Sequence, residues 1–283
     1  MIPNFTKRIK NKVRSVLLNF KRKYSAFEAQ FDDLTHKSAL RGFPLRRNER
    51  DILNLKGKEN GKRIFILGNG PSLNSTDVDL LCGDVSIASN AIFLLFYRKK
   101  FRPTYYTIED YLVAEDRAQE ASSYKHGWKI FPNDLKKFIK NDRLTMFINF
   151  QRNYQDFPKF SEDFLNSVFW GGTVTYMNLQ LAYYLGAKEI YLIGFDHNYS
   201  SPALNDKVNG PVITSMTEDI NHFDPRYFGS GYRWHDPKVE RMEEGYKYAK
   251  KFLESKGVKV FNATRGGKLE VFERVDFDSL FQK

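Results

Sequence analysis

Residues 63–81 read RIFILGNGPSLNSTDVDLL. Residues 63–67 form a short apolar run typical of a buried strand, and the segment after the glycine-rich turn reads as a helix. A strand, a tight turn and a helix in this order predict the first unit of a parallel α/β sheet. Gly68 and Gly70 permit a close approach to backbone N–H groups, and Ser72 suits a helix cap or a bond to a phosphate or ribose oxygen. A purely structural turn is the other interpretation of this spacing.

Further strands and helices alternate along the chain. Strands are predicted at DVSIASN (84–90), TYYTIED (104–110), TMFINF (145–150), EIYLIGFD (189–196) and KVFNAT (259–264), and long helices at residues 172–186 and 237–257. Strands separated by helical segments are typical of a mainly parallel, Rossmann-like sheet with helices on both faces. The sequence therefore predicts one α/β domain over residues 62–283, with a lid-like loop at 200–234 that shows no clear elements.

Polar residues follow the predicted strands at the points where the strands end. They are residues 68–72, Ser89 and Asn90, Glu109 and Asp110, residues 194–197, and residues 262–264. Because ligands of such sheets bind at the carboxyl ends of the strands, we expect these residues to line a site.

The glycine-rich turn lacks the signatures of two common nucleotide sites. No Gly-Lys-Ser or Gly-Lys-Thr follows Gly70, so the turn is not the lysine-containing phosphate loop of many ATPases. Leu73 stands where a dinucleotide-binding GxGxxG turn has its third glycine, which disfavours NAD.

The net charge of the chain is concentrated near its N-terminus. Residues 1–63 contain 17 Lys and Arg against 6 Asp and Glu, whereas residues 64–283 contain 28 of each. A neutral main domain argues against a nucleic-acid-binding face. Cys82 is the single cysteine, no apolar run is long enough to span a membrane, and no signal peptide is evident. We therefore expect a cytoplasmic protein.

Residues 1–61 are predicted to form a basic helical arm and a charged connector. Between residues 5 and 23, apolar residues recur at helical spacing and Lys and Arg occupy the other faces. A basic amphipathic helix of this kind suits a peripheral position on the inner face of an anionic membrane. Packing on the main domain or on a partner subunit is the chief alternative, and nucleic-acid binding by the arm is a weaker one. The sequence is also compatible with a homo-oligomer.

Several motifs, taken in order, resemble known glycosyltransferases. GNGPSL (68–73), SNAIF (89–93) and GTVTYMNLQLAYYLGAKEIYLIGFD (172–196), with a late His before a long helix, resemble the bacterial CMP-sialic-acid sialyltransferases of variant GT-A fold. RWHDPKVERM (233–242) and NATRGGKLEVFERV (262–275) are more similar still to the motility accessory factor glycosyltransferases and the 6-hydroxymethylpterin diphosphokinase MptE-like domains. The resemblance covers about residues 62–281 and leaves the arm outside it.

The resemblance implies three groups of site residues. The nucleotide would be held by Gly68, Asn69, Gly70, Ser72, Asn90, Gly172 and Thr173. The catalytic group would be His235 as the base, with Asp196 and Tyr199. The weaker third group, for the donor sugar or its phosphate, consists of His197 and Tyr232. Apart from the resemblance, Glu109, Asp110 and Arg265 are weak candidates for the same role because they follow predicted strands, and His222 with Asp224, in the 200–234 loop, is a weak candidate for a metal site.

The chemistry of these residues fits an inverting sugar transfer. A His of nearly neutral pKa can take the proton of an attacking hydroxyl, and hydrogen-bond donors can stabilise the departing phosphate. No metal-binding DxD motif is evident, so we expect neither a divalent metal nor another cofactor. The predicted function is transfer of an acidic sugar of nonulosonic-acid type from a CMP-activated donor to a surface-glycan or glycolipid acceptor. An ATP-dependent diphosphokinase acting on a pterin-like substrate, and a noncatalytic scaffold of polysaccharide assembly, are the alternatives.

Overall fold

The computed structural model describes residue 27 and residues 30–282. The amphipathic helix predicted at residues 5–23 lies outside these ranges. The chain divides into two compact units between residues 51 and 52. Residues 30–40 of the first unit are helical, and α2 (Arg47–Leu53) follows. Within the described ranges, no helix is both long and apolar enough to cross a membrane.

An eight-stranded sheet forms the centre of the larger unit, and every pair of neighbouring strands in it is parallel. Its order is β13-β12-β8-β1-β2-β3-β4-β5. The strands are β1 (Arg63–Leu67), β2 (Val85–Ser89), β3 (Tyr105–Thr107), β4 (Trp128–Pro132), β5 (Thr145–Ile148), β8 (Glu189–Ile193), β12 (Lys259–Asn262) and β13 (Glu273–Arg274). The predicted parallel, Rossmann-like α/β fold is confirmed.

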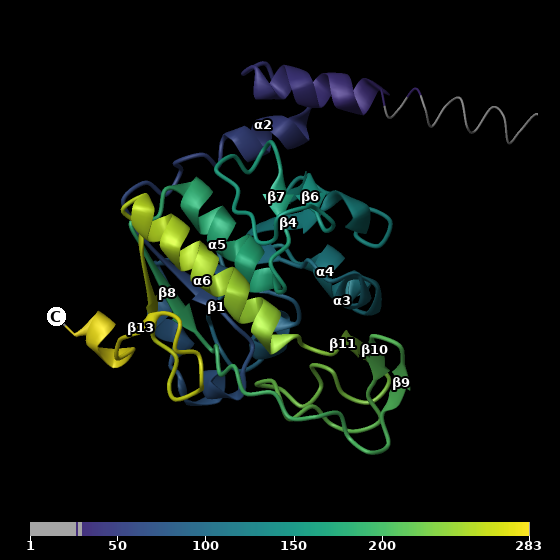
Figure 1. Cartoon of the computed structure of the whole chain (residues 1–283), viewed down its shortest axis with the longest axis vertical. Coiled ribbons are helices and arrows are strands. Elements are labelled where there is room, and N and C mark those ends of the chain that lie inside the picture. Colours follow the sequence, from purple (N-terminus) through teal and green to yellow (C-terminus); the bar gives the residue numbers. More distant parts are fainter. Residues whose placement is uncertain (1–26, 28–29, 283) are drawn as a thin grey trace, which may run out of the picture. The chain divides into compact units, whose positions relative to one another are not determined.

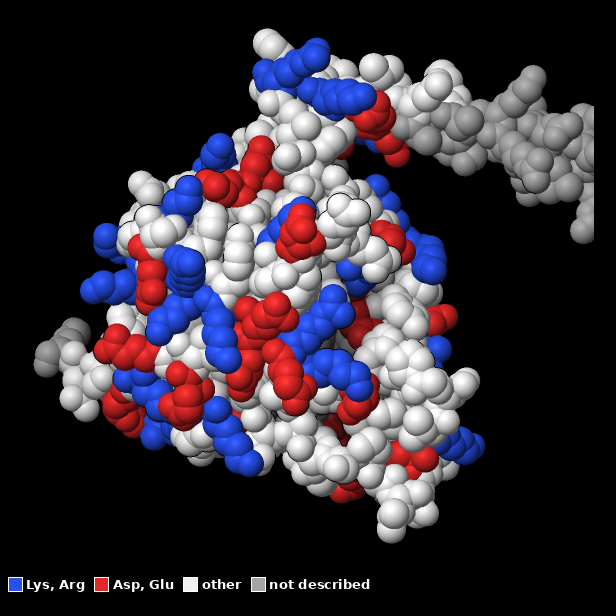
Figure 2. Space-filling view, in the orientation of Figure 1, with Lys and Arg blue, Asp and Glu red and all other residues white. Residues whose placement is uncertain are grey.

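Two long helices cover one face of the sheet, α5 (Val174–Leu185) and α6 (Val239–Ser255) (Figure 1). The alternation of β1 directs Ile64 and Ile66 to the opposite side from Phe65 and Leu67, and all four side chains are buried. α5 is buried over almost its whole length, whereas α6 is amphipathic and shows a solvent face. On that face Lys, Arg, Asp and Glu are interspersed (Figure 2), in keeping with the balanced charge of residues 64–283.

Shorter elements cover the other face. They are the 3-10 helices η1 (Pro71–Ser75), η2 (Val78–Leu81), η3 (Ile92–Leu95) and η5 (Asp278–Phe281), with α3 (Tyr111–Asp116) and α4 (Ala118–Ser123). Helices on both faces are thus confirmed, but the segment after the glycine-rich turn is not an α-helix. Polar side chains there bond locally instead, because the hydroxyls of Ser75 and Thr76 both donate to the Ser72 carbonyl, at 2.9 Å.

The sequence analysis missed β4. Lys129 is the second residue of this strand and Pro132 ends it, which hides the apolar pattern. Lys129 is fully buried, and its ammonium donates to Asp142 at 2.8 Å and to the Ser122 carbonyl at 3.0 Å. A buried lysine is tolerated here because its charge is paired.

The segment at 200–234 contains more structure than expected. It includes β9 (Lys207–Asn209) and β10 (Val212–Thr214), and with β11 (Arg233–His235) these form a three-stranded antiparallel sheet. The strands are too short and too exposed for a clear alternation of apolar and polar residues. The remaining elements are η4 (Asn133–Leu135) and a two-stranded pairing of β6 (Phe150–Gln151) with β7 (Val168–Phe169). We call residues 200–235 the lid segment.

Candidate active site

The strand order reverses beside β1. From β1 the chain moves outward through β2 to β5, and it then returns to β8 on the opposite side of β1. Ligands of doubly wound sheets bind in the crevice at such a reversal. Here the N–H of Gly68 donates to the carbonyl of Ile193 at 2.8 Å, and the N–H of Gly70 donates to the carbonyl of Gly194 at 2.9 Å. A Cβ on Gly68 would overlap the Gly194 carbonyl, so glycine is required for this approach.

Asp196, which follows β8, holds the glycine-rich turn in place. Its carboxylate accepts hydrogen bonds from the Ser72 N–H at 3.1 Å and from the Ser72 hydroxyl at 2.7 Å. These bonds occupy the groups of Ser72 that were expected to face a nucleotide. Asp196 and Ser72 therefore shape the turn, and their direct contact with a ligand stays a prediction.

Two non-glycine residues at this edge have left-handed backbone conformations. Asn90, directly after β2, has φ +56°, and His197, after β8, has φ +50°. Residues other than glycine rarely adopt this backbone conformation, and backbone strain of this kind is concentrated at functional sites. Both residues line a cavity of about 110 Å³ between the ends of β1, β2 and β8, which we call the small cavity.

The small cavity contains buried polar atoms that accept or donate no hydrogen bond within the described part of the chain. They are Oδ1 of Asn69, Oδ1 of Asn90 and Nε2 of His197, the last of which lies 3.4 Å from a carboxylate oxygen of Glu243. An unpaired buried polar atom costs about 1–3 kcal/mol, so a bound ligand or water that paired with these atoms would recover that free energy. Three of the predicted nucleotide or phosphate residues thus converge on one small, polar space.

The N-terminus of α5 lies between the small cavity and a second, larger one. Thr173 caps the helix by accepting from the Thr175 N–H at 3.4 Å, and Gly172 before it has φ +90°. Thr173 and Val174 line both cavities. Because the first N–H groups of a helix lack internal partners and lie at its positive end, this junction favours an anion.

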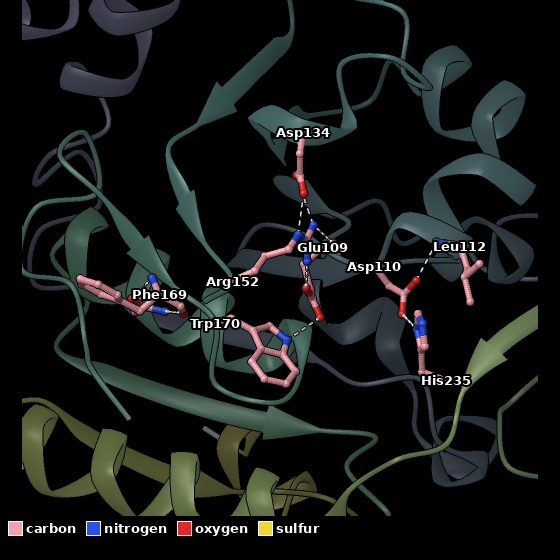
Figure 3. Close-up of polar contacts among 9 residues, drawn as sticks. Glu109, Asp110, Leu112, Asp134, Arg152, Phe169, Trp170 and His235 are labelled. Carbon is pink, nitrogen blue, oxygen red and sulfur yellow. Dashed lines mark hydrogen bonds and ion pairs between the residues drawn. The ribbon is translucent and has the colours of Figure 1, made fainter. Parts of the chain in front are cut away.

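The larger cavity, of about 650 Å³, contains a pair formed by His235 and Asp110 (Figure 3). His235 Nδ1 lies 2.6 Å from Asp110 Oδ2, and Asp110 Oδ1 accepts from the Leu112 N–H at 2.7 Å as the N-cap of α3. The carboxylate is therefore fixed by the helix and fixes the imidazole in turn. With Nδ1 donating to Asp110, the neutral ring has its lone pair on Nε2, as a general base requires.

The environment of His235 favours its protonated form. The hydrogen bond with Asp110 raises the pKa of His235 above its ordinary value, against the opposing effect of burial. Tyr111 contacts the ring edge-to-face, with the ring centroids 5.3 Å apart. His235 is thus a stronger base than a free imidazole and is held in one orientation.

A buried carboxyl group lies beside this pair, at the end of β3. Glu109 accepts from Arg152 at 2.9 Å and from the indole of Trp170 at 3.3 Å, and Arg152 also donates to Asp134 at 2.6 Å (Figure 3). Burial raises the pKa of Glu109 to about 7, although Arg152 acts in the opposite direction. The cavity wall therefore contains a carboxyl group that titrates near neutral pH.

The lid segment is fastened to α3 beside the large cavity. Arg233 on β11 donates from its backbone to Asp116 at 3.0 Å, and its guanidinium pairs with Asp116 and Glu115. Tyr199, just before the lid segment, lines both cavities. These contacts position β11, and with it His235, against the end of the sheet.

Three predicted site residues lie outside both cavities: Ser72, which is bonded to Asp196, and also Tyr232 and Arg265. Tyr232 packs under Arg117, whose guanidinium lies 3.7 Å from the ring centroid and donates to the Tyr232 hydroxyl at 2.8 Å. Arg265 pairs with Asp278 at 2.5 Å on the surface. None of the three side chains lines the small or the large cavity.

Sequence reasoning missed Arg152, Trp170 and Arg241, which all line the large cavity. Arg152 follows β5 closely, so its place after a strand was a usable signal. Arg241 lies over Trp170 and Phe157, with its guanidinium carbon 4.5 Å and 4.4 Å from the ring centroids. No local sequence pattern predicts this stacking, because Arg241 is on α6 whereas Phe157 and Trp170 precede α5, so the contact forms only in the folded chain.

His222 and Asp224, the weak candidates for a metal site, each pair with another residue. His222 pairs with Asp219 at 2.7 Å, and Asp224 pairs with Arg226 at 2.8 Å. Among residue 27 and residues 30–282, no group of three or more His, Cys, Asp and Glu side chains could hold a metal ion.

Comparisons with known proteins place the chain in a family. No curated protein matches it. A solved structure that it resembles is the MAf glycosyltransferase from Magnetospirillum magneticum AMB-1, with 17% identity and a TM-score of 0.46. The likeness covers 81% of this chain and 38% of that one. The family model for the 6-hydroxymethylpterin diphosphokinase MptE-like domain matches residues 43–202, more than half of the chain. The chain therefore belongs to the 6-hydroxymethylpterin diphosphokinase MptE-like family.

Proposed function

We propose that this chain is a glycosyltransferase that moves an acidic sugar of nonulosonic-acid type from a CMP-activated donor to a hydroxyl of a glycan or glycolipid acceptor. The observation that carries the proposal is the Asp110–His235 pair in a large cavity adjoining a small polar cavity. The order of the GNGPS, LIGFD and NATRGG motifs along the chain supports it.

The two cavities suit the two parts of the donor. The nucleotide phosphate would lie at the junction, where Thr173 and Val174 begin α5 and where Asn69 and Asn90 line the small cavity. The sugar and the acceptor hydroxyl would occupy the large cavity, beside His235. Arg241 at the cavity wall would bind the carboxylate of an acidic sugar.

The reaction follows from this arrangement. His235 Nε2 takes the proton of the acceptor hydroxyl while its oxygen attacks the anomeric carbon. The bond from that carbon to the phosphate oxygen breaks on the opposite side, so the configuration inverts and the electron pair leaves with CMP. Hydrogen-bond donors at the junction stabilise this charge, and the step as written needs no further cofactor and no divalent metal.

The expected location follows from the acceptor and from the sequence of the arm. A lipid-linked acceptor would lie at a membrane surface, and the basic residues between 5 and 23 would hold the enzyme at its inner, anionic face.

A phosphoryl transfer is the second candidate, and the family's description favours it. As a diphosphokinase, the chain would transfer a diphosphate from ATP to a pterin-like alcohol. Glu109, Asp110 and Asp196 would then have to recruit Mg²⁺, although all three are engaged: Glu109 with Arg152, Asp110 with His235 and Asp196 with the glycine-rich turn.

Titration calorimetry with CMP, UMP, AMP and ATP, followed by a turnover assay, separates the two functions. We expect CMP to bind most tightly and CMP-N-acetylneuraminic acid to be cleaved slowly to CMP in the absence of an acceptor. The His235→Ala variant should bind CMP normally and lose this cleavage, whereas His126→Ala, on the exposed surface, should keep both. Binding of ATP without CMP, with metal-dependent formation of AMP, would establish the diphosphokinase instead.

A further inference from the structure

The lid segment contains a second Asp–His pair, distinct from Asp110 and His235. His222 Nδ1 lies 2.7 Å from Asp219 Oδ2. Asp219 is almost fully buried and also accepts from the N–H groups of Asn221 at 2.8 Å and Phe228 at 2.9 Å. Burial acts in the opposite direction, but these hydrogen bonds lower the pKa of Asp219, so this carboxylate is ionised near neutral pH.

The plane of the His222 ring is fixed as well. It stacks on Tyr227 with the ring centroids 3.9 Å apart and an angle of 3° between the planes. Phe228 meets the same ring edge-to-face at 5.2 Å. With Nδ1 held by Asp219 and the plane held by two aromatic rings, Nε2 is the nitrogen left to meet another molecule.

His222 is tied to the glycine-rich turn through its neighbour. The N–H of Phe223 donates to the Asn69 carbonyl at 2.9 Å, and Asn74 donates to the Phe223 carbonyl at 3.0 Å. His222 accordingly lines the small cavity with Asn69 and Asn90.

The charges around the small cavity single out His222. None of the described residues that line it is Lys or Arg, and the lining carboxylate of Asp196 accepts hydrogen bonds from Ser72. His197 and His222 are the lining side chains that can become cationic, and Nε2 of His197 already lies 3.4 Å from Glu243. An anion in this cavity would therefore find its positive charge at His222.

We propose that His222 is the phosphate-binding group of the small cavity, with Nε2–H donating to a phosphate oxygen of the bound nucleotide. The identity of that nucleotide as CMP rests on the proposed function, but the role of His222 does not. Two anions, Asp219 and the phosphate, then flank the imidazolium and stabilise it. When the bond to the sugar breaks and the electron pair stays on the phosphate oxygen, His222 stabilises the added charge.

The experiment compares ligands that differ only in the phosphate. Calorimetry measures the Kd of CMP and of cytidine for the wild-type chain and for His222→Phe, which keeps a ring to stack on Tyr227, and His222→Gln. His126→Phe is the matched control, because His126 is exposed and lies outside both cavities. Thermal melting verifies that each variant is folded.

We expect His222→Phe to weaken CMP binding by about ten- to a hundredfold and to leave cytidine binding unchanged, since a charge-assisted hydrogen bond is lost. Unchanged CMP affinity, or an equal loss for CMP and cytidine, would overturn the proposal. If the wild-type chain binds ATP and not CMP, the proposed function fails, and the same comparison of ATP with adenosine decides the role of His222. Failure of the wild-type chain to bind any of these phosphates would overturn both.

Discussion

Replacing Asp110 with Asn tests whether His235 is a base held by a carboxylate. The variant preserves the size of the side chain and an oxygen that can still cap α3 at the Leu112 N–H. It replaces the oxygen that lies 2.6 Å from His235 Nδ1 with an amide group. An amide NH₂ at that position donates to Nδ1 and favours the tautomer with its proton on Nε2, which removes the lone pair from the substrate side.

The size of the effect follows from the exposure of the pair. General base catalysis contributes about 10²–10⁴-fold to a rate. The side chains of His235 and Asp110 are 32% and 25% exposed, so water partly screens their interaction. We therefore expect kcat/KM for the CMP-sugar to fall by about 10²–10³-fold, with little change in the Kd of CMP.

The pH dependence gives a second, independent readout. Asp110 raises the pKa of His235 and only the neutral ring is a base, so the wild-type rate should increase as pH rises through that raised pKa. In Asp110→Asn the pKa of His235 falls, and the acidic limb of the rate profile should move to lower pH. Asp77→Asn, an exposed carboxylate paired with Lys99, is the matched control. A variant with wild-type kcat/KM and an unmoved acidic limb would refute the assignment of His235.

Three further changes test the surroundings of the site. Glu109 has a pKa of about 7 against an ordinary 4.5, so the folded chain binds this proton more tightly than the unfolded chain and the free energy of unfolding falls as pH rises between these values. Glu109→Gln should remove about 3 kcal/mol of this pH dependence, which urea unfolding at pH 5 and pH 8 would measure. Gly68→Ala should lower the free energy of unfolding by about 1–3 kcal/mol because the new Cβ would overlap the Gly194 carbonyl, and an unchanged melting temperature would contradict this. Arg233→Met removes the ion pair with Asp116 that positions β11, and steady-state kinetics should show kcat reduced by roughly tenfold with the affinity for CMP retained.

The central sheet was predictable because its signals are local. Strands such as β1 and β8 are continuous apolar runs, and in a parallel sheet covered on both faces this pattern is what burial requires. The same reasoning missed β4, because Lys129 interrupts the run and its partner Asp142 is recognisable only in the fold. It also predicted a single helix after the glycine-rich turn, where the chain instead forms two short 3-10 helices and local side-chain bonds favour 3-10 geometry.

In the candidate site, too, the residues given by local sequence signals were predictable and the long-range contacts were not. Residues at strand ends, such as Asn69, Asn90 and Asp110, were found because the topology alone brings them to one edge. The pairing of Asp110 with His235 joins residues 125 positions apart through a lid segment whose strands carry little pattern. Sequence reasoning proposed both residues but did not predict that they meet, since that contact depends on how the lid segment packs against α3.

The family match covers one part of the candidate site and leaves the two histidines of the lid segment outside it. The match ends at residue 202, so it includes the glycine-rich turn, Asn90, Asp110 and the start of α5, which together form the edge of the sheet. His222 and His235 both lie beyond it, on the lid segment, and each is oriented by one carboxylate. In the proposed function, the matched part would hold the nucleotide, and the lid segment would bring the base to it. A substitution at His235, the proposed base for the acceptor hydroxyl, therefore discriminates between sugar transfer and phosphoryl transfer more sharply than any change at the shared edge, whereas a substitution at His222 tests phosphate binding in either reaction.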